Sequence, residues 1–183
     1  MRTKLVSIAL FLLVSSGFNA VKGQSYSVRT NLIGLATTNL NVEMSMALNR
    51  KWSLHFPLQY NPFVFKENLQ FRNFYFAPGA RYWLLESYLG GFIGLYGTAG
   101  TYSVGKLFGS KYRYEGSGYG FGISIGKAYQ LSKKWNLEWE LGYGAVWLKY
   151  DRYECKRCGD LIVSEHGWSL KPTRAAFNVV YLF

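Results

Sequence analysis

Residues 135–147 read WNLEWELGYGAVW, and this stretch decides the expected class of fold. Its odd positions are Trp, Leu, Trp, Leu, Tyr, Ala and Trp, whereas the even positions from 136 to 144 are Asn, Glu, Glu, Gly and Gly. Alternation of apolar and polar residues with a period of two indicates a β-strand, because successive residues of a strand face opposite sides of the sheet. The stretch therefore predicts a strand with one continuous apolar face.

The same alternation recurs along the chain, for example in residues 40–49, 52–60 and 173–183. We predict eight strands, at about residues 26–36, 40–48, 52–60, 71–84, 89–103, 118–130, 135–149 and 173–183. Most of them reach the ~9 to 11 residues that a tilted strand needs to cross a membrane. Pro57 and Pro78 lie inside two of these strands, where each missing N–H donor predicts an irregularity.

The connections between the expected strands alternate in length. Short turns at 49–51, 85–88 and 132–134 alternate with longer segments at 61–70, 104–117 and 150–172. This asymmetry is typical of outer-membrane barrels, which have short periplasmic turns and long outer loops. Only the first expected outer loop, around Thr37 and Thr38, is short.

Period two alone does not say which face of the strands is the inner one. A soluble, lipocalin-like barrel would place the apolar face inside, and it stays open as the alternative. Two features favour a membrane: the polar faces are rich in glycine, and the apolar faces end in Trp and Tyr, as in interfacial girdles. The prediction is an all-β fold, an eight-stranded, antiparallel, up-and-down transmembrane β-barrel.

The first residues have the order of a secretory signal peptide. Arg2 and Lys4 precede an apolar run from Leu5 to Val14, and small or polar residues follow to Gly23. We expect residues 1–23 to be a signal peptide cleaved before Gln24, with Ala20 as the alternative cleavage site, and residues 24–183 to form the barrel domain in the bacterial outer membrane. An uncleaved anchor is the other interpretation, although a spanning helix needs ~20 apolar residues.

The net charge of the chain is positive. Removing residues 1–23, which carry Arg2, Lys4 and Lys22 and no acid, lowers the formal charge from +11 to +8. The remaining basic residues are scattered, and an exported protein does not meet nucleic acid, so no nucleic-acid partner is expected. Four of these residues fall in the short turns, where they are expected to anchor the barrel to outer-membrane lipid: Arg50, Lys51, Lys133 and Lys134.

Six charged side chains lie on the polar faces of the expected strands: Arg29, Glu43, Arg81, Glu138, Glu140 and Arg174. Unpaired buried charge is costly, so we expect an interior network of paired charges. A proton or ion path is the alternative interpretation. A barrel of eight strands is filled by its own side chains, so we expect no ion conduction. Large inward side chains should lie against a wall of glycines on the sixth and seventh strands: Arg29, Glu43, Tyr75, Arg81 and Trp83.

Cys155 and Cys158 are the two cysteines of the chain, and they lie in the longest expected outer loop. In an exported chain an even cysteine count favours a disulfide that stiffens the loop. A zinc site with His166 and either Asp160 or Glu165, or a redox pair, are the alternatives. His166 with Ser164, Ser169 and Asp160 also has the residue types of a hydrolase, but not its sequence pattern. No cofactor is predicted.

Three motifs carry a resemblance to a known family. They are SKKWNLEWELGYG at 132–144, NRKWSLHF at 49–56, and CKRCG at 155–159 followed by KPTRAAFNVVYLF at 171–183. With them the chain resembles a family of small outer-membrane β-barrel proteins of unknown function from Bacteroides-type bacteria. The terminal Tyr-Leu-Phe resembles the signal that such barrels present to the barrel-assembly machinery.

The family that the chain resembles is similar in genomic setting to surface-appendage genes in some cases, and the resemblance therefore implies an accessory role toward appendage proteins. The predicted function is thus a non-enzymatic outer-membrane barrel with a structural, surface-binding or appendage-assembly role. The alternative is an outer-membrane lipid- or peptide-modifying enzyme that uses outer-loop residues.

Overall fold

A computed structural model describes residues 26–63, 70–105, 113–153 and 161–183. The expected signal peptide and the two cysteines, Cys155 and Cys158, lie outside these residues. The described chain consists of nine strands and one short helix. In order these are β1 (Tyr26–Asn31), α2 (Leu32–Ala36), β2 (Leu40–Ala47), β3 (Trp52–Asn61), β4 (Gln70–Phe76), β5 (Gly79–Trp83), β6 (Gly90–Gly105), β7 (Arg113–Gln130), β8 (Trp135–Tyr153) and β9 (Leu161–Leu182).

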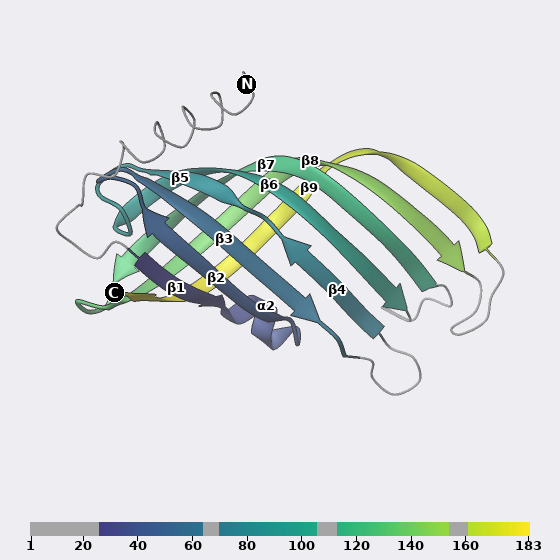
Figure 1. The fold of residues 1–183 in the computed structure, drawn as a ribbon, viewed down its shortest axis with the longest axis horizontal. Coiled ribbons are helices and arrows are strands. Elements are labelled where there is room, and N and C mark those ends of the chain that lie inside the picture. Colours follow the sequence, from purple (N-terminus) through teal and green to yellow (C-terminus); the bar gives the residue numbers. More distant parts are fainter. Residues whose placement is uncertain (1–25, 64–69, 106–112, 154–160) are drawn as a thin grey trace, which may run out of the picture.

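The strands form one antiparallel sheet that closes on itself (Figure 1). Successive strands pair along the chain except for β4 and β5, and β1 pairs with β9 from Ser27–Leu182 to Asn31–Asn178, so the first and last strands are neighbours. The pairing of β1 with β9 closes the ring, although β9 pairs with β1 only from Asn178 to Leu182. The predicted all-β, up-and-down antiparallel fold is confirmed.

β4 and β5 together occupy one place in the ring. Both pair with β3 and with β6, and the register of β5 continues that of β4 on both sides. The gap between them holds Ala77 and Pro78, and Ala77 donates to the carbonyl of Pro57 at 3.3 Å. Neither proline has an N–H to donate, so the irregularities expected at Pro57 and Pro78 coincide in this one gap between β4 and β5. Because β4 and β5 share one place, the ring has the expected eight strand positions.

Three expected boundaries are wrong, and one of them is the start of β7, which begins at Arg113 instead of about 118. The strand expected at 26–36 ends at Asn31, whose side chain accepts from the N–H of Ile33 and caps the one-turn helix α2. The last strand begins at Leu161, well before the expected start at 173, because β8 and β9 form a long hairpin through most of the expected loop 150–172. β9 contains an irregularity, since its register with β8 shifts between Gly142 and Tyr143.

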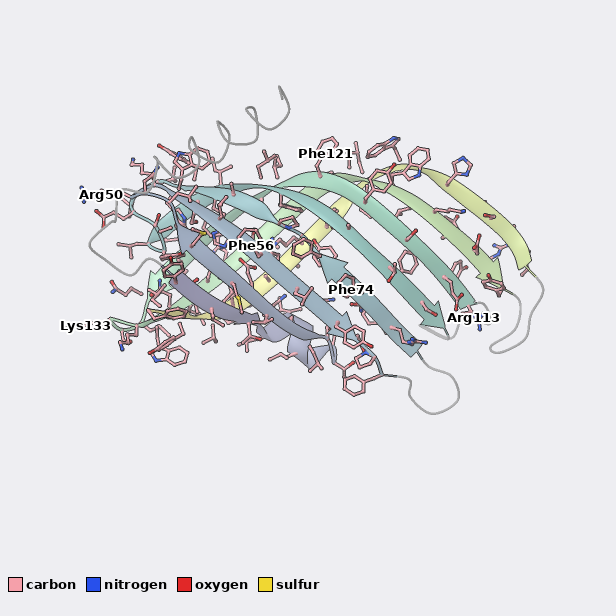
Figure 2. The ribbon with its side chains drawn as sticks, in the orientation of Figure 1. Arg50, Phe56, Phe74, Arg113, Phe121 and Lys133 are labelled. Carbon is pink, nitrogen blue, oxygen red and sulfur yellow. The ribbon has the colours of Figure 1, made fainter. Side chains whose placement is uncertain are left out.

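The two surfaces of the ring have opposite polarity. Outward residues of the central strands are large, apolar and exposed, among them Leu95 at 63%, Ile123 at 62% and Leu170 at 69%. Inward residues include buried arginines and glutamates. Figure 2 shows Phe121 on the outer surface, Arg50 and Lys133 at one end, and Arg113 at the other. We name the first end the turn end and the second the loop end. Among the described residues, no helix is both long and apolar enough to cross a bilayer.

Glycines of β7 and β8 face the lumen, as expected, but the large side chains against them come from elsewhere. A Cβ atom at Gly122 or Gly142 would meet the ring of Tyr96, and one at Gly126 would meet the ring of Phe92. Both rings belong to β6, the strand beside β7. The rings nearest to these glycines thus come from the neighbouring strand, while Arg81, one of the expected inward side chains, reaches β8 at Glu138 and Glu140.

Candidate functional site

A buried cluster of three arginines and three glutamates fills the middle of the lumen. Each side chain is between 1% and 9% exposed. We name these six residues the charge cluster: Arg29 on β1, Glu43 on β2, Arg81 on β5, Glu138 and Glu140 on β8, and Arg174 on β9. They are the six residues expected inside from the alternation pattern, and the structure brings all of them together.

Arg29 and Glu138 form the most regular pair of the charge cluster. Nη1 of Arg29 donates to Oε1 and Oε2 of Glu138 at 2.7 and 2.8 Å. Nε of Arg29 lies 3.5 Å from Oε1 of Glu43, at ion-pair distance. Because β9 lies between β1 and β8, this ion pair connects two strands that are not neighbours in the sheet.

Arg81 and Arg174 connect the remaining carboxylates. Arg81 lies 3.0 Å from Glu138, 3.2 Å from Glu43 and 2.6 Å from Glu140. Arg174 lies 2.5 Å from Glu43 and 2.8 Å from Glu140. Each glutamate thus has at least two arginine partners, and the six charges balance. Buried charges persist only when paired and hydrogen-bonded in this way.

Neutral donors and acceptors complete the charge cluster. Nη2 of Arg29 donates to the hydroxyls of Ser27 and Ser45 at 3.0 and 3.2 Å, and the amide of Asn178 donates to Glu138 at 3.1 Å.

Toward the turn end an apolar group closes the lumen: Trp83, Tyr88, Phe92, Ala128, Val180 and Leu182. The Arg81 guanidinium lies 4.5 Å from the centroid of the Phe92 ring, so the two layers are in contact.

A second polar chain leads away from Glu43 through His55. His55 Nδ1 lies 2.8 Å from Glu43 Oε1, and His55 Nε2 lies 2.7 Å from Ser53 Oγ. This is the order of groups in a Ser-His-acid triad. Ser53 is 0% exposed, however, and its Oγ accepts the indole N–H of Trp83 at 2.7 Å. The signal was present in the sequence, because Ser53 and His55 share the polar face of one strand.

The basic residues of the turns lie at the turn end, beside aromatic residues. Nζ of Lys51 is 5.8 Å from the centroid of the Tyr82 ring, and Nζ of Lys134 is 5.9 Å from that of Tyr181. Arg50 forms an exposed ion pair with Glu86 at 2.5 Å. Lys133 lies in the same turn as Lys134, at the same end (Figure 2).

Of the residues of the hydrolase alternative, Ser164 and His166 share the outer face of β9, and no hydrogen bond joins them in the described part of the chain. His166 lies on β9 and faces outward beside Trp147, at 5.6 Å between ring centroids. Ser169, three residues further along, pairs with the inward Val146 and so lies on the other face. Asp160 lies outside the described residues. Within the described ranges, no three His, Cys, Asp or Glu side chains are placed to hold a metal ion.

Residues 8–183 match the model of the family described as "Protein of unknown function (DUF3575)", and the chain belongs to that family. The match includes every strand of the ring and all six residues of the charge cluster. No curated protein and no solved structure matches the chain.

Proposed function

We propose that this protein is an integral outer-membrane β-barrel without enzymatic activity, which serves a structural or surface-binding role and assists the assembly of surface appendages. The observation that carries the membrane part is the reversed polarity of the ring. Exposed aliphatic side chains cover the outside of the central strands, while six charges are buried inside. A soluble barrel would need the opposite arrangement.

Two belts of aromatic residues support this proposal. At the turn end the belt contains Tyr26, Trp52, Tyr82, Trp135, Tyr181 and Phe183, which pack in pairs with 5.0 to 6.3 Å between ring centroids. Toward the loop end Trp168 packs against Tyr119, Phe121 and Trp147. Aromatic girdles and nearby lysines are typical of both interfaces of a membrane barrel.

The substitution Ile123→Arg tests the membrane location. Ile123 is an outward residue between the two belts, so in a bilayer an arginine there should lower the free energy of unfolding by about 2 to 4 kcal/mol. In a soluble ring an exposed substitution changes stability by only about 0.5 kcal/mol. The measurement is urea-induced unfolding of the protein in phosphatidylcholine vesicles.

Ser117→Arg is the matched control, because Ser117 faces outward on the same strand but beyond the aromatic belt. It should leave stability nearly unchanged. Equal small effects of both arginines, together with release of the protein from membranes by alkaline carbonate, would contradict the membrane proposal.

The filled lumen supports a role other than transport. The charge cluster and the apolar group around Trp83 and Phe92 cross the lumen, and an eight-stranded barrel is just wide enough for side chains to fill it. The purified protein should show no steady conductance in planar bilayers. Reproducible conductance steps that depend on the protein would favour the ion path instead.

The enzyme alternative has one observation in its favour, the Ser53–His55–Glu43 chain. Because Ser53 is fully buried and accepts from Trp83, we expect no reaction with a fluorophosphonate serine probe. Labelling that is lost in Ser53→Ala would assign hydrolytic activity.

The accessory role is tested by tagging the chain in its own cells, where appendage proteins should co-purify; recovery of the barrel alone would count against it.

A further inference from the structure

A cavity of about 440 Å³ occupies the lumen between the charge cluster and the loop end. Ligand pockets for small molecules have volumes of roughly 300 to 1,000 Å³. Its wall toward β7–β9 is largely apolar, with Val146 and Leu148 on β8 and Ala176 on β9, and Tyr75 and Tyr102 also line it. The inward Gly100 and Gly118 contribute no side chain.

The opposite wall of the cavity is polar but largely satisfied by its own hydrogen bonds. The amide of Gln59 donates to Asn73 at 3.0 Å, and that of Asn73 donates to Asn39 at 2.6 Å. The Asn41 amide donates to the carbonyls of Asn31 and Asn39, both at 3.0 Å. These carboxamides brace the turn between β1 and β2, so most of their hydrogen-bonding groups already have partners in the protein. The apolar wall is therefore the larger surface that a ligand can cover.

Lys171 adds a positive charge to this apolar surface. It pairs in register with the inward Gly144 and lines the cavity. The register shift after Gly142 has placed it there: without the irregularity, Lys171 and Arg174 would face opposite sides of β9. Among the described residues, no acid forms an ion pair with Lys171, and the charge cluster below it is already balanced.

We infer that this cavity binds a small amphiphile whose anionic head, a carboxylate or a phosphate, contacts Lys171 and whose apolar body lies against Val146 and Leu148. A cation beside an apolar wall in a half-enclosed site recognises both parts of such a molecule. The inference needs only the closed ring and its lining residues, and so it stands apart from the proposed location and accessory role.

The experiment is equilibrium binding of cis-parinaric acid, a fluorescent fatty acid, to the full protein in phosphatidylcholine nanodiscs, with empty nanodiscs as the baseline. One saturable site per protein is expected. Val146→Phe should abolish it by filling the cavity, and Lys171→Glu should weaken it by about tenfold or more. Lys149→Glu is the matched control, because Lys149 lies on the outer face of β8, and it should bind as the unmodified protein does.

Competition by decyl phosphate would show that phosphate heads are accepted, and its failure would assign the site to carboxylates. Unchanged binding in both Val146→Phe and Lys171→Glu would overturn the inference, because the probe would then only partition into lipid. Equally tight binding of the uncharged parinaryl alcohol would overturn the role of Lys171. Lys171→Met, which adds no bulk or new charge, repeats the test if Val146→Phe fails to fold.

Discussion

The two halves of the lumen are built from the same strands but are filled in different ways. Toward the turn end, rings of Phe92 and Tyr96 lie against the glycines of β7 and β8, and the charge cluster occupies the remaining space. Toward the loop end, Gly100 of β6 and Gly118 of β7 contribute no side chain, and a cavity of about 440 Å³ remains. The number of strands sets the width of the lumen, whereas the positions of the large side chains of β6 decide which part of the lumen is filled.

Arg81→Ala should have the largest effect on this difference. Arg81 contacts all three glutamates of the charge cluster, so its loss leaves buried carboxylates without enough positive charge. Removing one partner of a buried ion pair costs about 3 to 5 kcal/mol. The free energy of unfolding, measured by urea titration, should fall by that amount.

The control is Arg50→Ala at the turn end, where the pair with Glu86 is 77% and 55% exposed. An exposed pair contributes only about 0 to 1 kcal/mol. Similar losses for Arg81→Ala and Arg50→Ala would mean that the charge cluster does not hold the filled half together.

Gly126→Ala should have an intermediate effect. Its Cβ would meet the Phe92 ring and the carbonyl oxygen of Trp139, and a methyl group forced into a packed region costs about 1 to 3 kcal/mol. Gly167→Ala, whose Cβ has open space within 4 Å, should change stability by no more than about 0.5 kcal/mol. The two midpoints of thermal unfolding should differ accordingly; coincident midpoints would remove the packing argument for the filled half.

Val146→Phe should have the smallest effect, because its larger side chain enters the cavity. We expect a change in the free energy of unfolding below about 1 kcal/mol, since no neighbour needs to move. Ala128→Phe is the matched substitution in the filled half, where Ala128 is 3% exposed, and it should cost about 1 to 3 kcal/mol. A larger loss for Val146→Phe than for Ala128→Phe would reverse the comparison of the two halves.

The sequence predicted the strands and the two faces of most of them because both follow from a period of two. The choice of the polar face as the inner one depended instead on its glycines and on the Trp and Tyr residues of the apolar face. Glu138 and Glu140 alternate with Leu137 and Trp139, so their common side could be read directly. Which arginine pairs with which glutamate could not be read, because that depends on the register between strands far apart in the chain. The pair between Arg29 and Glu138 is of this kind.

The cavity and the strand extensions were beyond sequence reasoning for a different reason. The register shift after Gly142 reverses the alternation in the first half of β9, so Lys171 faces inward although its distance from Arg174 predicts the opposite. Residues 150–172 are expected as a loop because charged residues are frequent among them, and because the outward apolar positions Trp168 and Leu170 lie before the register shift and so are out of phase with the last strand.

The seam between β1 and β9 has a consequence for the order of folding. It runs only from Ser27–Leu182 to Asn31–Asn178, whereas β7 and β8 pair from Arg113–Tyr153 to Gln130–Asn136. Pairing of neighbouring strands closes short loops, but the seam joins the two ends of the described chain and loses more conformational entropy on closure. We expect it to form last. Since Arg29 reaches Glu138 only across this seam, the charge cluster is completed at the final step of folding. Interactions formed after the transition state slow unfolding, so we expect the charge cluster to slow the opening of the seam.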